Sequence, residues 1–274
     1  MTIKPIVSWS FEPCKKSSAW QSKQMMLACA KLSLLSIAKH YGRPTVFTDF
    51  AGKSILAELT DCCDFDTALE GCFSDVPLEF WAYPKLFTYS LQDKPYIHFD
   101  LDFIVHQKFD QQLLSCDVAF QNFEPISETR HTYITDVDNC DLWLPEIFNR
   151  YKLDLISPPN VGFLLFNDMA FNKKYCDEAI NMVKQNANFD FSKSKDRYRV
   201  NCIVEQQLLG LMLRKSGVSY MPFMPPTTSS LNHHFDHYLG GIKNFWATQK
   251  NLQPYIDDSV KAAAAKLNSL LLQE

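Results

Sequence analysis

The feature that most constrains the fold is an apolar run over residues 95–105, PYIHFDLDFIV, that two carboxylates interrupt. Such a run is typical of a buried strand, and Asp100 and Asp102 stand where that strand would end. Because successive strand side chains alternate in direction, we expect both carboxylates on one side and Leu101 on the other, toward the core. Two ionised carboxylates about 5–6 Å apart repel by roughly 3 kcal/mol at an effective dielectric constant near 20. The pair therefore indicates a positive charge between them.

A hard divalent cation, held through oxygen ligands together with substrate phosphates, is the ordinary way to offset such a pair. The alternative is a strand-end turn in which Asp100 and Asp102 only cap backbone N–H groups. The residues of this run alone leave both interpretations open.

A second group of polar residues lies near the end of the chain, in residues 232–243, NHHFDHYLGGIK. Histidine offers a neutral nitrogen ligand, glycine lets backbone N–H groups approach a phosphate, and lysine neutralises charge. Taken singly, His233 and His234 are more typical of a solvated turn than of a binding site. A zinc hydrolase built on His233, His234 and His237 is a further alternative, although the chain has no His-Glu-x-x-His sequence.

Together the two groups resemble a known family, the retaining glycosyltransferases of the glycogenin and lipopolysaccharide galactosyltransferase type. Residues 237–243, HYLGGIK, are similar to its His-x-x-Gly-x-x-Lys signature, and residues 100–102 to its Asp-x-Asp. Between them, residues 160–167, NVGFLLFN, resemble its Asn-x-Gly-Val strand, and residues 205–208, EQQL, its Asp-Gln-x-x segment. The chain departs from the family in having Glu205 in place of Asp and Asn244-Phe245-Trp246 in place of Pro-Trp.

The resemblance implies a GT-A-like fold and a role for each matching residue. Mn²⁺ or Mg²⁺ would be bound by Asp100, Asp102 and His237. The donor diphosphate would contact Gly240 and Lys243, and the sugar and acceptor would lie near the catalytic candidates Asn160, Glu205 and Gln206.

The bulk properties predict one α/β domain over residues 1–250, followed by a helix in 251–274. A net charge of −4 with scattered lysines and arginines argues against a nucleic-acid partner. Nine cysteines without regular spacing, and no amino-terminal signal pattern, predict a reducing cytoplasmic location. No run approaches 18 apolar residues, so we expect no membrane span.

The pattern along the chain predicts alternating strands and helices, which is typical of a parallel sheet flanked by helices, a Rossmann-like arrangement. Strands are expected over residues 3–10 and 44–49, with a helix between them that Ser17 or Ser18 caps and Gly42 ends. Short helices follow near residues 55–59 and 84–89. Because ligands bind at the carboxyl ends of such strands, the donor site is expected to include Ser8, Trp9, Asp49, Asp100, Leu101 and Asp102. Lys85, on the helix before the acidic strand, is a further donor-binding candidate that would reach a phosphate or pair with an aspartate; a solvated helix face is the alternative.

Two further helices are predicted near the carboxyl end of the chain. Residues 200–214 have helical apolar spacing and Gly217 follows them, which places Glu205 and Gln206 on a helix. Residues 222–226, PFMPP, are expected to form a loop leading to the motif-bearing tail. Residues 257–272 form an amphipathic helix that would pack on the domain or on a partner subunit, giving a homo-oligomer.

The sequence therefore favours a metal-dependent hexosyltransferase-like enzyme that moves a sugar from a nucleoside diphosphate, with uridine expected, to a hydroxyl acceptor with retention. A sugar-phosphate nucleotidyltransferase is the first alternative, but it would carry a glycine-rich loop after the first strand, where residues 8–13 are SWSFEP. A non-catalytic protein that binds nucleotide-sugars on the same scaffold is the second.

Overall fold

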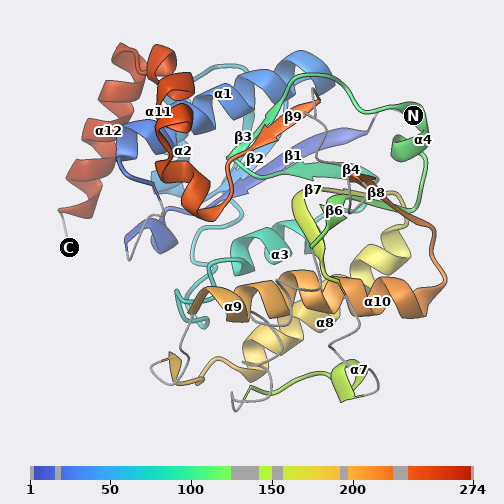
Figure 1. Ribbon diagram of the computed structural model, residues 1–274. Coiled ribbons are helices and arrows are strands. Elements are labelled where there is room, and N and C mark those ends of the chain that lie inside the picture. Colours follow the sequence, from blue (N-terminus) through green and yellow to red (C-terminus); the bar gives the residue numbers. More distant parts are fainter. Residues whose placement is uncertain are drawn as a thin grey trace. The chain divides into compact units, whose positions relative to one another are not determined.

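The computed structural model describes residues 3–15, 20–124, 142–149, 157–191, 197–224 and 234–272. These residues form two compact units whose segments interleave along the chain. The first unit comprises Met1–Gly71, Ile97–Phe109 and Ser230–Glu274, and the second comprises Cys72–Tyr96 and Asp110–Ser229. The predicted fold class, α/β with a central, mostly parallel sheet flanked by helices, is confirmed (Figure 1).

The first unit is built on parallel strands. β1 (Lys4–Trp9), β2 (Thr45–Thr48) and β3 (Asp64–Asp66) are parallel neighbours, with Val7 opposite Val46 and Val46 opposite Phe65. β4 (Tyr96–Phe99) follows β1 in the strand order β3-β2-β1-β4. A separate antiparallel pair consists of β5 (Phe103–Val105) and β9 (Phe235–His237).

Two helices of this unit begin at side-chain caps. α1 (Lys23–Tyr41) is capped by Ser22, whose hydroxyl accepts a hydrogen bond from the Met25 N–H at 3.1 Å. The predicted caps Ser17 and Ser18 are therefore wrong, because the capping hydroxyl is Ser22; both predicted residues lie outside the described ones. The predicted stop at Gly42 is confirmed, and its φ of 87° is a conformation that favours glycine.

α2 (Phe50–Ala57) begins earlier than residues 55–59 predicted, because Asp49 caps it through the Gly52 N–H at 2.6 Å. The unit ends with the 3₁₀ helix η6 (Gly240–Asn244), α11 (Trp246–Leu252), the 3₁₀ helix η7 (Gln253–Tyr255) and α12 (Asp258–Leu271). The predicted amphipathic helix is thus α12, which packs against α1 and α2 where the red and blue helices lie together in Figure 1.

The second unit has its own strands and helices. β7 (Pro159–Phe166) is buried along its whole length, pairs antiparallel with β6 (Val118–Phe123), and β6 pairs parallel with β8 (Tyr220–Met224). The loop predicted over residues 222–226 is wrong for Pro222 to Met224, because they continue β8 beside β6; the two prolines after them lie outside the described residues.

The described helices of the second unit are α3 (Tyr83–Ser90), α4 (Gln111–Leu114), α7 (Glu146–Asn149), α8 (Met169–Gln185), α9 (Arg197–Cys202) and α10 (Leu208–Ser216). α3 has Pro84 in its first turn, as predicted. Between α9 and α10, residues Ile203–Gln207 form a π-helix, so the predicted helix over 200–214 exists but is wider in the middle.

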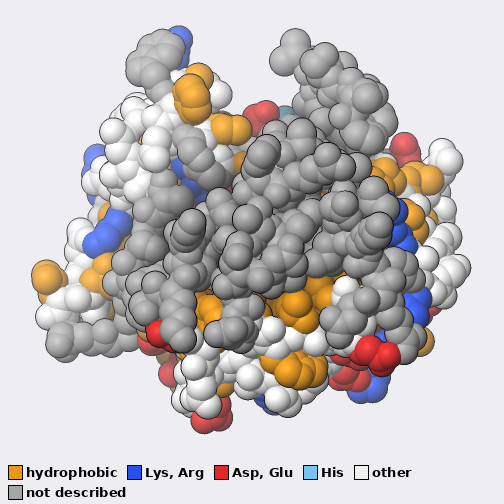
Figure 2. All heavy atoms as spheres, turned by 60° about the horizontal axis from the view of Figure 1, so that its bottom comes forward, with side chains coloured by type: hydrophobic (Ala, Val, Ile, Leu, Met, Phe, Trp, Pro, Cys, Tyr) orange, Lys and Arg blue, Asp and Glu red, His pale blue; other side chains and the backbone are white. Residues whose placement is uncertain are grey.

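The surface carries charges of both signs close together. In Figure 2 the coloured acidic and basic side chains are interspersed with apolar ones. On α8, for example, Lys173 lies 3.3 Å from Asp177. Among the described helices, none is both long and apolar enough to cross a membrane.

Candidate metal centre

The pairing of β5 with β9 brings the two sequence motifs of the first unit together. Phe103 is opposite His237, and the Tyr238 N–H donates to the Asp102 carbonyl at 3.0 Å. Beneath the pair, Ile104 and Tyr238 join an apolar cluster with Cys29 of α1 and Leu252 of α11. Backbone pairing and burial of this cluster therefore fix His237 beside the acidic residues.

The sequence predicted that the acidic residues continue the strand pattern of β4, but the structure shows that they do not. β4 ends at Phe99, residues 100–102 form a turn, and the Phe103 N–H donates to the Asp100 carbonyl at 3.0 Å. The Ser33 hydroxyl of α1 holds this turn by donating to the Phe103 carbonyl at 2.7 Å. The expected strand alternation is therefore wrong here, and Leu101 is half-buried. A turn, not a shared strand face, brings the carboxylates close.

The three predicted metal ligands converge. One ligand atom from each of Asp100, Asp102 and His237 lies within 4.8 Å of the others, and all three residues are half-buried. Two carboxylates and one imidazole form a donor set that Mn²⁺ or Mg²⁺ could use. The residues therefore fit a divalent cation.

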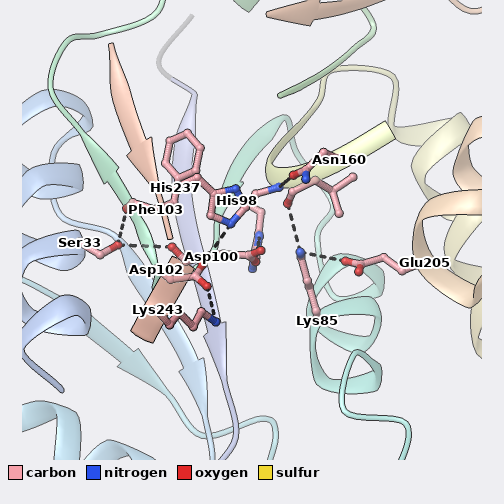
Figure 3. Close-up of polar contacts among 12 residues, drawn as sticks. Ser33, Lys85, His98, Asp100, Asp102, Phe103, Asn160, Glu205, His237 and Lys243 are labelled. Atoms are coloured by element: carbon pink, nitrogen blue, oxygen red, sulfur yellow. Dashed lines mark hydrogen bonds and ion pairs between the residues drawn. The ribbon is translucent and has the colours of Figure 1, made fainter. Parts of the chain in front are cut away.

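Positive groups already surround Asp102 (Figure 3). Its carboxylate lies 3.3 Å from Nε2 of His237 and 2.8 Å from Nζ of Lys243. Burial by itself would raise the pKa of Asp102, but His237 and Lys243 outweigh it and hold that pKa well below its usual range. The Lys243 ammonium also lies 5.4 Å from the centre of the Trp20 ring. Asp102 is thus ionised over the whole physiological pH range.

Two of the predicted donor-binding residues at the strand ends of this unit have protein partners. Ser8 lies 2.9 Å from Nε2 of His98. Asp49 is buried, and besides capping α2 its carboxylate accepts hydrogen bonds from Ser10 at 2.7 Å and the Phe11 N–H at 2.6 Å. Asp49 therefore organises the loop after β1. Trp9, at the end of β1, is half-buried.

Residues of the last motif lie in and around η6. Gly240 opens this 3₁₀ helix and Lys243 lies in its last turn. The Ile242 carbonyl accepts from the buried Thr248 hydroxyl at 2.8 Å, which ties η6 to α11. Of the residues considered for a zinc site, His234 contributes its carbonyl to the backbone of residues 106 and 107, and His233 lies outside the described residues.

The remaining predicted residues form a cluster within the second unit (Figure 3). Lys85 of α3 is buried, with its Nζ 2.9 Å from the Glu205 carboxylate and 3.1 Å from the Val161 carbonyl that accepts from it. Asn160 is buried on β7, and its amide donates to Glu124 at 2.9 Å. The structure therefore gives Lys85, which we predicted near the donor, a carboxylate partner in this unit.

The π-helix of this unit carries uncompensated polar atoms. Oε1 of Gln206 and both amide atoms of Gln207 are buried without a hydrogen-bond partner. Gln207 is 1% exposed. Such atoms are rare in folded proteins, and π-helical turns are frequent at functional sites. Gln207 was missed by the sequence reasoning, although its place beside Gln206 was a signal.

His98 and Trp20 were also missed. His98 is two residues before Asp100 in a strand pattern, so the sequence could have predicted that the two side chains lie on the same face. Trp20 is far from the motifs in sequence, and only the fold brings it to Lys243.

The arrangement of strands and helices is similar to that of solved glycosyltransferases. A crystal structure of the galactosyltransferase LgtC in complex with donor and acceptor sugar analogs matches with a TM-score of 0.50 and 13% identity, covering 95% of this chain and 100% of that one. A structure of an active-site mutant of LgtC matches with a TM-score of 0.52 and 12% identity, over 92% and 95% of the two chains. At such identities the likeness concerns the fold, which is GT-A-like as predicted.

The chain is therefore a protein of the GT-A-like fold class with an Asp-Asp-His cluster. It belongs to DUF6734, a family of unknown function, whose model matches residues 7–255. A comparison with curated proteins finds no match.

Proposed function

We propose that this protein is a metal-dependent glycosyltransferase that transfers a sugar from a nucleoside diphosphate, with UDP as the expected carrier, to a hydroxyl acceptor. The observation that carries the proposal is the convergence of Asp100, Asp102 and His237, with Lys243 on the same carboxylate. The GT-A-like fold is consistent with this reaction. The resemblance of the motifs adds the expectation that anomeric configuration is retained.

Asp100, Asp102 and His237 would hold Mn²⁺ or Mg²⁺. When bound, such a cation supplies charge stabilisation to the oxygens of the donor diphosphate. The protein contributes an ionised carboxylate, because the pKa of Asp102 is held low against its burial by His237 and Lys243. No proton has to leave Asp102 for a cation to bind at neutral pH.

Lys243 would stabilise the leaving group. Its ammonium lies 2.8 Å from the Asp102 carboxylate. Once Asp102 has another positive partner, the flexible side chain of Lys243 can turn to the diphosphate, where negative charge accumulates as the glycosidic bond breaks. The N–H groups near Gly240 would assist, as the family resemblance implies.

The sugar and the acceptor would be bound by the π-helix and β7 of the second unit, through Gln206, Glu205 and Asn160. The unpartnered Oε1 of Gln206 supports this role, because a buried acceptor without a partner is stabilised by a ligand hydroxyl. Lys85 would hold the Glu205 carboxylate in place through their 2.9 Å contact. A nucleotidyltransferase is less well supported, because the chain has no glycine-rich loop after β1.

The test combines metal binding with turnover. Mn²⁺ binding is measured by electron paramagnetic resonance, and nucleoside diphosphate release is measured with a panel of UDP- and GDP-sugars and acceptors. Mutation of a residue that only supports a metal ligand typically weakens metal binding by roughly 10- to 100-fold. Asp102→Asn and His237→Ala change the ligands themselves, so each should weaken Mn²⁺ binding by more than that. Lys243→Gln should bind Mn²⁺ at least as tightly as wild type but turn over about 10²- to 10³-fold more slowly.

Asp236→Asn is the matched control, because Asp236 neighbours His237 but pairs with His106 at 2.9 Å on the surface. This variant should retain both activities. Unchanged Mn²⁺ binding in Asp102→Asn and His237→Ala would show that the metal site is wrong. Metal-dependent release of pyrophosphate from a nucleoside triphosphate, instead of diphosphate from a nucleotide-sugar, would favour the nucleotidyltransferase.

A further inference from the structure

A buried histidine of the first unit precedes the turn of residues 100–102, which we call the acidic turn. His98 of β4 is 0% exposed, and the other residues of this strand, Tyr96, Ile97 and Phe99, are buried and apolar or aromatic. An imidazole in such a strand loses its hydration, so its ring nitrogens need polar partners to offset that cost. An apolar residue would fill this place without that requirement.

Each ring nitrogen of His98 faces a different functional candidate. Nε2 lies 2.9 Å from the Ser8 hydroxyl of β1. Nδ1 lies 3.9 Å from the Asp100 carboxylate, and Figure 3 shows His98 and Asp100 side by side. The second distance is within ion-pair range but too long for a direct hydrogen bond. The negative carboxylate favours a proton on Nδ1, and Nε2 then accepts a hydrogen bond from Ser8.

We propose that His98 is a positioning residue: it orients the Asp100 carboxylate for the cation and connects it to Ser8, the predicted donor-binding residue of β1. The proposal rests on the metal site of the proposed function. It follows the general rule that a group behind a metal ligand fixes the orientation and basicity of that ligand. The link from Ser8 to Asp100 would make metal affinity sensitive to occupancy of the donor position.

Two substitutions separate the two faces of the ring. Asparagine places its amide near the position of Nδ1, so His98→Asn keeps a group facing Asp100 and loses the one facing Ser8. Glutamine reaches the position of Nε2, so His98→Gln keeps the contact with Ser8 and loses the one with Asp100. Both replace the imidazole with a neutral amide, and the unfolding temperature of each variant reports any difference in packing.

Binding of Mn²⁺ alone is measured by electron paramagnetic resonance, well below the unfolding temperature of each variant. His98→Gln should weaken binding about 10- to 100-fold, and His98→Asn should stay much closer to wild type. Ser8→Ala removes the partner of Nε2 and leaves the contact of Nδ1 with Asp100, so it should weaken Mn²⁺ binding less than His98→Gln does. Equal losses in both His98 variants that follow their unfolding temperatures, or unchanged binding in His98→Gln, would overturn the proposal.

A measurement on the wild-type protein covers the case in which neither variant folds. In ¹⁵N-histidine spectra, assigned by residue-specific labelling, the His98 ring should carry its proton on Nδ1 and should shift when Mg²⁺ is added. A ring protonated on Nε2 that does not respond to Mg²⁺ would refute the proposal. Asp102→Asn separates the two hypotheses: if it abolishes Mn²⁺ binding while His98→Gln does not, only the role of His98 is wrong.

Discussion

The acidic turn of the first unit and the lysine–glutamate pair of the second unit both balance opposite charges, but at different depths. The side chains of Asp102 and Lys243 are 18% and 16% exposed, whereas those of Lys85 and Glu205 are 11% and 3% exposed. Asp102 also has His237 within 3.3 Å, so its carboxylate has two partners, Lys243 and His237. A carboxylate that is partly open and has several partners can exchange one of them for an ion, while a buried pair must stay together.

The two regions also differ in the backbone that carries them. In the first unit a turn and an antiparallel strand pair hold the candidate ligands, and backbone hydrogen bonds such as Phe103 N–H to the Asp100 carbonyl and Tyr238 N–H to the Asp102 carbonyl fix them. In the second unit a π-helix holds Glu205 to Gln207, and the Tyr175 hydroxyl donates to the Glu205 carbonyl at 2.9 Å. The first region therefore presents a charged carboxylate on a fixed backbone. The second has buried amide atoms of Gln206 and Gln207 that lack a hydrogen-bond partner.

The largest expected effect is on the buried pair. Lys85→Met should lower the free energy of unfolding by about 3–5 kcal/mol, because Glu205 would keep a buried charge without its lysine. Urea unfolding at pH 7 measures this, and the double variant Lys85→Met/Glu205→Leu should recover much of the loss. Lys173→Met is the control, since its exposed pair with Asp177 contributes less than about 1 kcal/mol. If Lys85→Met lowered the free energy of unfolding no more than Lys173→Met does, the buried Lys85–Glu205 pair would not differ from an exposed pair.

A smaller effect concerns the acid stability of the turn. Burial raises the pKa of Asp102, but His237 and Lys243 lower this pKa by more than burial raises it. The folded-state pKa therefore lies below the unfolded value of about 3.9. The stabilisation is therefore complete above about pH 4 and disappears as the pH falls through the folded-state pKa. Relative to Asp102→Asn, wild type should be more stable by about 1.5–3 kcal/mol at pH 6, and this difference should shrink below pH 4.

Urea unfolding of both proteins between pH 3 and 6 measures this difference. Asp236→Asn, which removes an exposed carboxylate from the same strand, should not change the acid limb in this way. A difference between wild type and Asp102→Asn that stayed constant down to pH 3 would contradict the assignment of that charge.

The smallest effect is expected at Gln207. Gln207→Met should leave the free energy of unfolding unchanged or raise it by up to about 1 kcal/mol, because both amide atoms are buried without partners. Asn201→Leu is the matched control: this buried amide accepts from the Ala82 N–H at 2.9 Å and donates to the Glu79 carbonyl at 2.8 Å, so its loss should destabilise the unit by about 1–3 kcal/mol. If Gln207→Met lost as much stability as that control, the Gln207 amide would have to make hydrogen bonds that stabilise the fold.

Local signals predicted much of the fold because they act over a few residues. Proline in the first turn of α3, Gly42 after α1 and the apolar spacing of α12 each specify an element without distant partners. The π-helix was not predicted, because one extra residue in a turn barely changes the apolar pattern and depends on packing such as the Tyr175 contact. The turn after β4 was missed for a similar reason, since Ser33 of another helix holds it.

The sequence by itself determined the chemistry of the candidate site: two carboxylates at the end of an apolar strand, and an imidazole and a lysine at fixed spacing near the carboxyl end of the chain. Only the tertiary structure decided which groups meet, through the pairing of β5 with β9 and the placement of His98 between Ser8 and Asp100. The physical reason is range. Residue type and spacing fix charge and local conformation, whereas a contact between residues 90 positions apart, as for Ser8 and His98, depends on the packing of the whole unit.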